Sequence, residues 1–93
     1  MTVEWSADAL ADLDRFAAFL HQHFPQLAKS IAIELIDKIN VLRVRPFLGR
    51  PLAGRRGYRQ IILQARNAAY VVQYRIDGER LVILRVFHGR EAR

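Results

Sequence analysis

The residues of this chain that could do chemistry gather near its C-terminus. His88 stands between Arg85 and Arg90 in the sequence Arg-Val-Phe-His-Gly-Arg. A histidine changes charge near neutral pH and could act as an acid or a base, while an arginine could hold a phosphate group. These three residues are the candidate catalytic set if the protein cleaves RNA. One histidine among arginines is more often a surface contact or a structural hydrogen-bond donor, so both interpretations stay open.

Other kinds of chemistry find less support. The chain has no cysteine, which excludes disulfides, a thiolate nucleophile and a cysteine zinc site. His21 and His23 are two residues apart, so in a helix they point in different directions, and no acid stands in register to complete a metal site. The segment with Arg50, Arg55 and Arg56 lacks the Gly-Lys-Ser/Thr ending of a nucleotide P-loop. We therefore expect no metal and no cofactor.

Charge is distributed unevenly along the 93 residues. The chain carries 15 basic and nine acidic side chains, and residues 43–93 hold 12 of the basic and only three of the acidic ones. The second half is therefore strongly positive, which favours an acidic partner. Arg55 and Arg56 form either a solvated basic loop or a contact with that partner. Tyr58, Tyr70 and Tyr74 could stack on unpaired bases, although packing in the core is the more ordinary role.

Two stretches have the apolar spacing of three and four residues that marks an amphipathic helix. The first covers residues 7–23 and follows Ser6, a favourable N-cap, with Asp8 in its first turn. The second follows Pro25, which suits a first helical turn, and must end before Pro46. The apolar positions are Leu10, Leu13, Phe16, Ala17, Leu20 and Phe24, then Ala28, Ile31, Ala32, Leu35, Ile36, Ile39 and Leu42. A helical hairpin is expected.

Strands are predicted on both sides of this hairpin. Residues 2–5 alternate polar and apolar, and a Pro- and Gly-rich loop at 46–57 leads to three further stretches at 58–63, 69–76 and 80–87. Asp77-Gly78 predicts a two-residue type I′ turn, which makes the last two strands antiparallel.

The order β-α-α-β-β-β predicts an α+β fold in which a two-helix hairpin packs on one face of a small, mostly antiparallel sheet. We expect one domain over residues 1–93.

Both faces of the last strand are apolar apart from Arg85, so either the long loop or another chain should cover its second face. Alternation places Val82, Leu84 and Val86 on one face and Leu81, Ile83, Arg85 and Phe87 on the other. The expected core is Trp5, Leu13, Phe16, Leu35, Ile39, Val72 and Leu84.

The longest apolar runs have only five residues, which is too short for a membrane span, and an acid at position 4 argues against a secretory signal. A cytoplasmic protein is expected.

Several motifs, taken in their order and spacing, resemble the ParE/RelE superfamily of toxins from bacterial type II toxin–antitoxin modules, which include plasmid stabilisation proteins. They are Trp5-Ser6, Ala9, Asp12-Leu13, the segment from Pro46 to Arg50, Arg59 to Ile61, the Tyr-Val-Val-Gln-Tyr-Arg of residues 70–75 and the Ile-Leu-Arg-Val-Phe-His-Gly-Arg of residues 83–90. The resemblance implies a cytoplasmic growth inhibitor that is neutralised by a small antitoxin encoded beside it.

The superfamily has two main targets. RelE-like members are ribosome-dependent mRNA endonucleases with an arginine directly after the aromatic residue of the strand at 69–76, where this chain has Val71 after Tyr70. They also carry a Tyr or His near the C-terminus, and this chain has His88 but no C-terminal Tyr. ParE-like members poison DNA gyrase and lack the catalytic set. We therefore expect a non-enzymatic gyrase inhibitor with His88, Arg90 and Arg93 as target contacts, and keep the nuclease as the alternative.

An acidic antitoxin is expected to cover the open face of the sheet and the arginine-rich loop. Its predicted contacts are Arg85, Arg55, Arg56, Ile83 and Phe87, and Arg85→Glu should weaken it most. The chain has no helix-turn-helix or zinc finger, so DNA is expected to be reached only through the antitoxin. A third interpretation is a protein that still binds its antitoxin but is no longer toxic.

Overall fold

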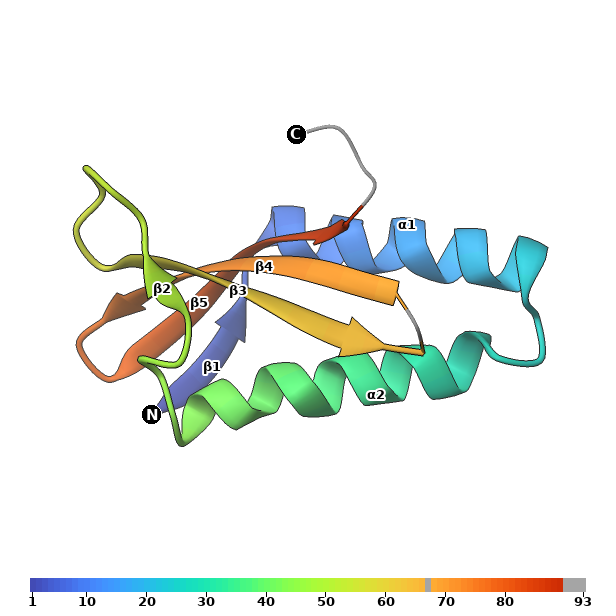
Figure 1. Ribbon diagram of the computed structural model, residues 1–93, viewed down its shortest axis with the longest axis horizontal. Helices are drawn as coiled ribbons and strands as arrows, with labels where there is room; N and C mark the ends of the chain where they lie inside the picture. The colour runs from blue at the N-terminus through green and yellow to red at the C-terminus, as the bar shows by residue number, and fades with distance from the viewer. Residues whose placement is uncertain (67, 90–93) are drawn as a thin grey trace.

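The computed structural model describes residues 1–66 and 68–89. Two helices pack on one face of a five-stranded sheet with the strand order β1-β5-β4-β3-β2 (Figure 1). β1 runs parallel to β5, and every other neighbouring pair is antiparallel. The elements are β1 Thr2–Trp5, α1 Ala7–His23, α2 Ala28–Asn40, a 3-10 turn at Val41–Arg43, β2 Arg50–Pro51, β3 Tyr58–Ala65, β4 Ala68–Asp77 and β5 Arg80–His88. The predicted α+β architecture is confirmed.

The start of α1 follows the sequence signal. The Ser6 side chain accepts a hydrogen bond from the Ala9 N–H at 3.0 Å, which satisfies one of the donors that a helix leaves open at its N-terminus. α2 begins later than predicted, because the backbone around Pro25 forms a turn and regular helix starts at Ala28. None of the helices in the described ranges is long and apolar enough to cross a membrane.

Two details of the sheet differ from the prediction. The β4–β5 turn lies one residue further on, because Asp77 pairs with Arg80 and leaves Gly78 and Glu79 at its tip. Of these two turn residues only Gly78 has a positive φ, +60°, which is the pattern of a type II′ turn rather than type I′. The segment predicted as loop also contains β2, whose two residues pair with Arg59 and Gln60.

A β-bulge in β5 changes which side chains face the helices. Tyr74 pairs with Ile83 and Gln73 pairs with Arg85, so Leu84 is the extra residue. A bulge inserts one residue and shifts the alternation by one, so the face assignment predicted for β5 is wrong beyond Ile83. Ile83 and Val86 are both fully buried in the core, and Leu84 is only half-buried.

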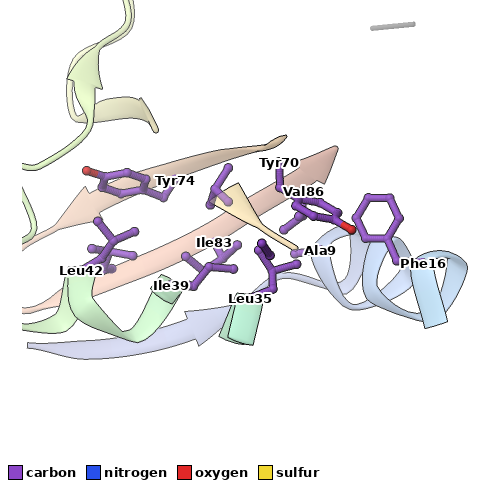
Figure 2. Packing of buried hydrophobic residues seen from close by; sticks show 12 residues of the cluster. Ala9, Phe16, Leu35, Ile39, Leu42, Tyr70, Tyr74, Ile83 and Val86 are labelled. Atoms are coloured by element: carbon purple, nitrogen blue, oxygen red, sulfur yellow. The ribbon is translucent and has the colours of Figure 1, made fainter. Parts of the chain in front are cut away.

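The core lies between the helical hairpin and the sheet. Figure 2 shows Leu35 and Ile39 of α2 and Ala9 and Phe16 of α1 packed against side chains of β4 and β5. Four of the predicted core residues are buried, Phe16, Leu35, Ile39 and Val72. Trp5 and Leu13 are partly buried and pack against this cluster, whereas Leu84 occupies the bulge.

Tyr74 fastens the loop before β2 to the core. Its hydroxyl donates to the Pro46 carbonyl at 2.7 Å and accepts the Gly49 N–H at 2.9 Å. Burial raises the pKa of Tyr74 above its ordinary value, so the hydroxyl stays protonated. A Cβ on Gly49 would lie 2.6 Å from this oxygen, so the loop packs on the ring with no room for a side chain.

Tyr74→Phe is expected to lower the free energy of unfolding by about 1 to 3 kcal/mol, because the buried Gly49 N–H loses its acceptor. Tyr58→Phe is the matched control. Tyr58 is half-buried, and its hydroxyl makes no hydrogen bond within residues 1–66 and 68–89, so its loss should change stability by less than about 0.5 kcal/mol. Urea unfolding of both variants measures the difference, and equal midpoints would contradict the assignment.

Candidate functional site

His88 ends β5 on the side of the sheet that faces the helices. It pairs across the strands with Tyr70, and the two rings meet edge to face with centroids 5.4 Å apart. Tyr70 in turn meets Phe16 of α1 edge to face at 5.5 Å. His88 therefore ends a row of three aromatic rings that links β5 to α1 through β4.

This row forms one wall of an apolar groove of about 910 Å³. The helical hairpin extends past the end of β3 and the start of β4 (Figure 1), and the groove lies between the hairpin and these strand ends. Phe19, Phe24 and Leu27 line it and are 42 to 51% exposed. Its polar lining includes Arg15, Arg66 and His88. The sequence placed Phe24 on the apolar stripe of the first helix but gave no sign that a groove would form beyond the sheet.

Arg85 is bound within the chain. Its Nε and Nη2 donate to the Asp12 carboxylate at 2.9 and 3.1 Å, and Arg15 Nη1 donates to the same group at 2.8 Å. Asp12 is 1% exposed and also accepts the Val86 backbone N–H at 2.8 Å. Burial by itself would raise the pKa of Asp12, but the hydrogen bonds from Arg85, Val86 and Arg15 outweigh it and lower this pKa.

Asp12 lies beside the part of β5 that extends beyond its pairing with β1. β1 pairs with β5 only as far as Ile83, so the backbone of β5 beyond that residue would be an open edge. Asp12 takes the Val86 N–H at this edge, and the Ser6 hydroxyl donates to the Leu84 carbonyl at 2.9 Å. No role of its own was expected for Asp12. An acid in register with the apolar stripe, four residues before Phe16, was the available signal.

One row of side chains on the face of the sheet away from the helices is apolar near the end of β5. Val71 alternates with the core residues Tyr70 and Val72 and so points to this open face. It pairs with Phe87 on one side and with Ile62, which is 61% exposed, on the other. The row across the three strands therefore carries no charge.

The arginine-rich loop forms a separate basic surface. Arg55 and Arg56 are exposed, and the Arg55 guanidinium lies 5.4 Å from the centroid of the Tyr58 ring. The loop lines a shallow hollow of about 680 Å³ together with Phe47 and Tyr58. It projects at the end of the molecule opposite the turn between the helices (Figure 1).

The predicted site residues that lie within the described ranges fall into four groups. Ile83 is fully buried and faces the core rather than the surface. Arg85 and Phe87 lie together at the edge of the open face, with the guanidinium 4.7 Å from the ring centroid. Arg55 and Arg56 lie on the distant loop, and His88 lines the groove. Arg90 and Arg93 are outside the described residues.

The tyrosines and the histidines of α1 are also placed. Tyr70 and Tyr74 are 3% and 0% exposed, so they pack in the core and offer no stacking surface. His21 and His23 are exposed in the last turn of α1. Within residues 1–66 and 68–89, no group of three histidine or acidic side chains could hold a metal ion.

Comparison with known proteins assigns the chain to a family. The model of the ParE toxin of the type II toxin–antitoxin system parDE matches residues 3–93. The chain belongs to this family. It is therefore a toxin of a type II toxin–antitoxin system. It is also 29% identical over 92 residues to the toxin RelE1 of Caulobacter vibrioides, a match that covers 99% of this chain and 97% of that protein.

Several solved structures have the same fold as this ParE-family toxin. The chromosomal ParDE system from P. aeruginosa matches with a TM-score of 0.77 and 23% identity, over 95% of each chain. The intact E. coli RelBE complex matches with a TM-score of 0.67 and 16% identity, over 97% of this chain and 98% of that one. The RelBE2 complex of Mycobacterium tuberculosis is 30% identical, with a TM-score of 0.57 over 94% of this chain and 95% of that one.

Proposed function

We propose that this toxin stops bacterial growth by poisoning DNA gyrase, without an enzymatic activity of its own. The observation that carries the proposal is the uncharged row formed by Ile62, Val71 and Phe87. RelE-like nucleases resemble this chain but have an arginine at the position of Val71. Here a valine that is 4% exposed fills that place.

The arrangement of the other candidate groups agrees with this proposal. A nuclease must clamp the scissile phosphate and move protons at one place. His88 lies on the helix side of the sheet, whereas Val71 lies on the open face. Arg85, which the sequence predicts as a clamp, is bound through two nitrogens to Asp12. Gyrase poisoning needs surface complementarity to a protein–DNA complex and no such catalytic set.

The second candidate function is a ribosome-dependent mRNA endonuclease. It is favoured by the groove, because His88, Arg15 and Arg66 all line it, and a histidine with guanidinium groups supplies the parts for acid–base chemistry on a phosphate.

A cognate acidic antitoxin is proposed to neutralise the toxin, because the solved relatives are toxin–antitoxin complexes. Of its predicted contacts, Phe87, Arg55 and Arg56 have side chains at the surface. Arg85 also reaches the surface, with 39% of its side chain exposed while Asp12 holds the guanidinium, whereas Ile83 is buried and is not part of that surface. Target contacts by His88, Arg90 and Arg93 remain part of the proposal.

Induction of the toxin in bacteria separates the two candidate functions. We expect filamentation and a DNA-damage response with intact transcripts, and accumulation of covalently cleaved DNA when the toxin is added to purified gyrase. The variant His88→Ala should leave transcripts intact as well. His21→Ala removes an exposed histidine of α1 and is the matched control. Codon-positioned mRNA cleavage that persists in His21→Ala and disappears in His88→Ala would overturn the proposal and establish the nuclease.

A further inference from the structure

The middle of the chain contains a long stretch without an acid. From Lys38 to Ile76 there are nine basic residues and no Asp or Glu. Within the described residues, only Lys38 and Arg66 of this stretch form ion pairs, both with Glu34 of α2. The other basic residues of the stretch therefore repel one another, and no carboxylate within residues 1–66 and 68–89 pairs with them. They are Arg43, Arg45, Arg50, Arg55, Arg56, Arg59 and Arg75.

The loop that carries most of these arginines has a defined shape. The Leu52 N–H donates to the Tyr58 carbonyl at 2.9 Å, and the Tyr58 N–H donates to the Arg55 carbonyl at 3.1 Å. Arg59 holds the start of the loop, because its Nη1 donates to the Gly49 carbonyl at 2.6 Å. A loop held in this way presents Arg55 and Arg56 without a large ordering cost when a partner binds.

Aromatic rings are interleaved with the cations. The Arg59 guanidinium lies 4.9 Å from the centroid of the Phe47 ring, and Arg55 lies 5.4 Å from that of Tyr58. Phe47 is 68% exposed beside the hollow of the loop. Exposed rings next to arginines suit stacked bases and phosphates together, whereas an acidic peptide would use only the arginines.

We propose that the loop at residues 46–59 binds the phosphodiester backbone of a nucleic acid with an unpaired base. Arg55 and Arg56 contact phosphates, and Phe47 and Tyr58 stack on the base. Nucleic acid is thus bound directly at this end of the molecule, in contrast to the expectation that DNA is reached only through the antitoxin. The site lies away from His88 and the groove, so the proposal stands or falls separately from the choice between gyrase and the ribosome.

Fluorescence anisotropy with the purified full chain tests the proposal. The probes are single-stranded DNA, single-stranded RNA, duplex DNA and polyglutamate, each titrated between about 50 and 200 mM salt. We expect the single strands to bind more tightly than the duplex. With single strands, Arg55→Gln and Arg56→Gln should each make the slope of log K against log salt less negative by about 0.7, which is a loss of about fivefold in affinity at 0.1 M salt.

Lys29→Gln is the matched control, since it removes one exposed charge from the start of α2, at the opposite end of the molecule. It should leave both the affinity and the slope unchanged. Phe47→Leu should weaken single-strand binding and spare the duplex. The proposal is overturned if Lys29→Gln weakens binding as much as the loop variants do. Binding of polyglutamate but of none of the nucleic acids would also overturn it and assign the loop to an acidic protein. Thermal melts check that each variant is folded.

Discussion

Asp12→Ala is expected to lower the free energy of unfolding by about 1.5 to 3 kcal/mol, because the buried Val86 N–H loses a charged acceptor, whereas the side chains of Arg15 and Arg85 are 46 and 39% exposed and can turn to water. The carboxylate is 1% exposed and accepts hydrogen bonds from Arg85, Arg15 and the Val86 backbone. Without it, a buried N–H on β5 loses its acceptor and the edge of the sheet opens beside α1. Urea unfolding followed by circular dichroism measures the loss.

Asp14→Ala provides the matched control, because Asp14 is an exposed acid on the same helix. Its removal should change stability by less than about 0.5 kcal/mol. If the two alanine variants unfolded at the same urea concentration, Asp12 would not hold β5.

The contact between Asp12 and Arg85 changes how the variant Arg85→Glu must be judged. This variant places two carboxylates together, so weaker antitoxin binding has to be compared with any loss of folding.

The same residue gives the protein an acid-sensitive contact. Because hydrogen bonding lowers the pKa of Asp12 in the folded chain, its contribution to stability is fully present above the unfolded value of about 3.9. The contribution is lost as the pH falls through the lower, folded pKa. The difference in unfolding free energy between the natural chain and Asp12→Asn should therefore be constant near neutral pH and shrink below about pH 4. A constant difference down to pH 2 would contradict the assignment.

The sequence predicts most of the architecture because local signals carry it. Apolar residues three and four apart define α1 and α2, and Ser6 marks the start of α1. Alternating and β-branched residues give the strands. These patterns depend only on neighbours in the chain, and they are enough to place each of the predicted helices and strands.

Features that depend on contacts between distant residues could not be predicted. The bulge at Leu84 is fastened by Ser6, which is 78 residues away, and it moves Ile83 and Val86 into the same core. Arg85 looked like a surface contact because nothing in the local sequence points to Asp12, 73 residues earlier. Each prediction on the last strand assumed strict alternation, which fails at the bulge. The candidate site was therefore less predictable than the fold.

Leu35→Ala carries the other large expected effect, about 2 to 5 kcal/mol of stability, since it removes buried carbons and leaves a cavity. Leu35 is 2% exposed and packs near Ala9 and Ile39 between α2 and the sheet (Figure 2). Leu13→Ala should cost less, because Leu13 only borders the core. Leu10 belongs to the same kind of apolar stripe but is 51% exposed, so Leu10→Ala should cost less than about 0.5 kcal/mol. The periodic pattern ranks the three leucines alike, whereas packing between the hairpin and the sheet ranks them by depth. Urea midpoints in the order Leu35→Ala, Leu13→Ala, Leu10→Ala, from lowest to highest, would agree with this packing, and equal midpoints would contradict it.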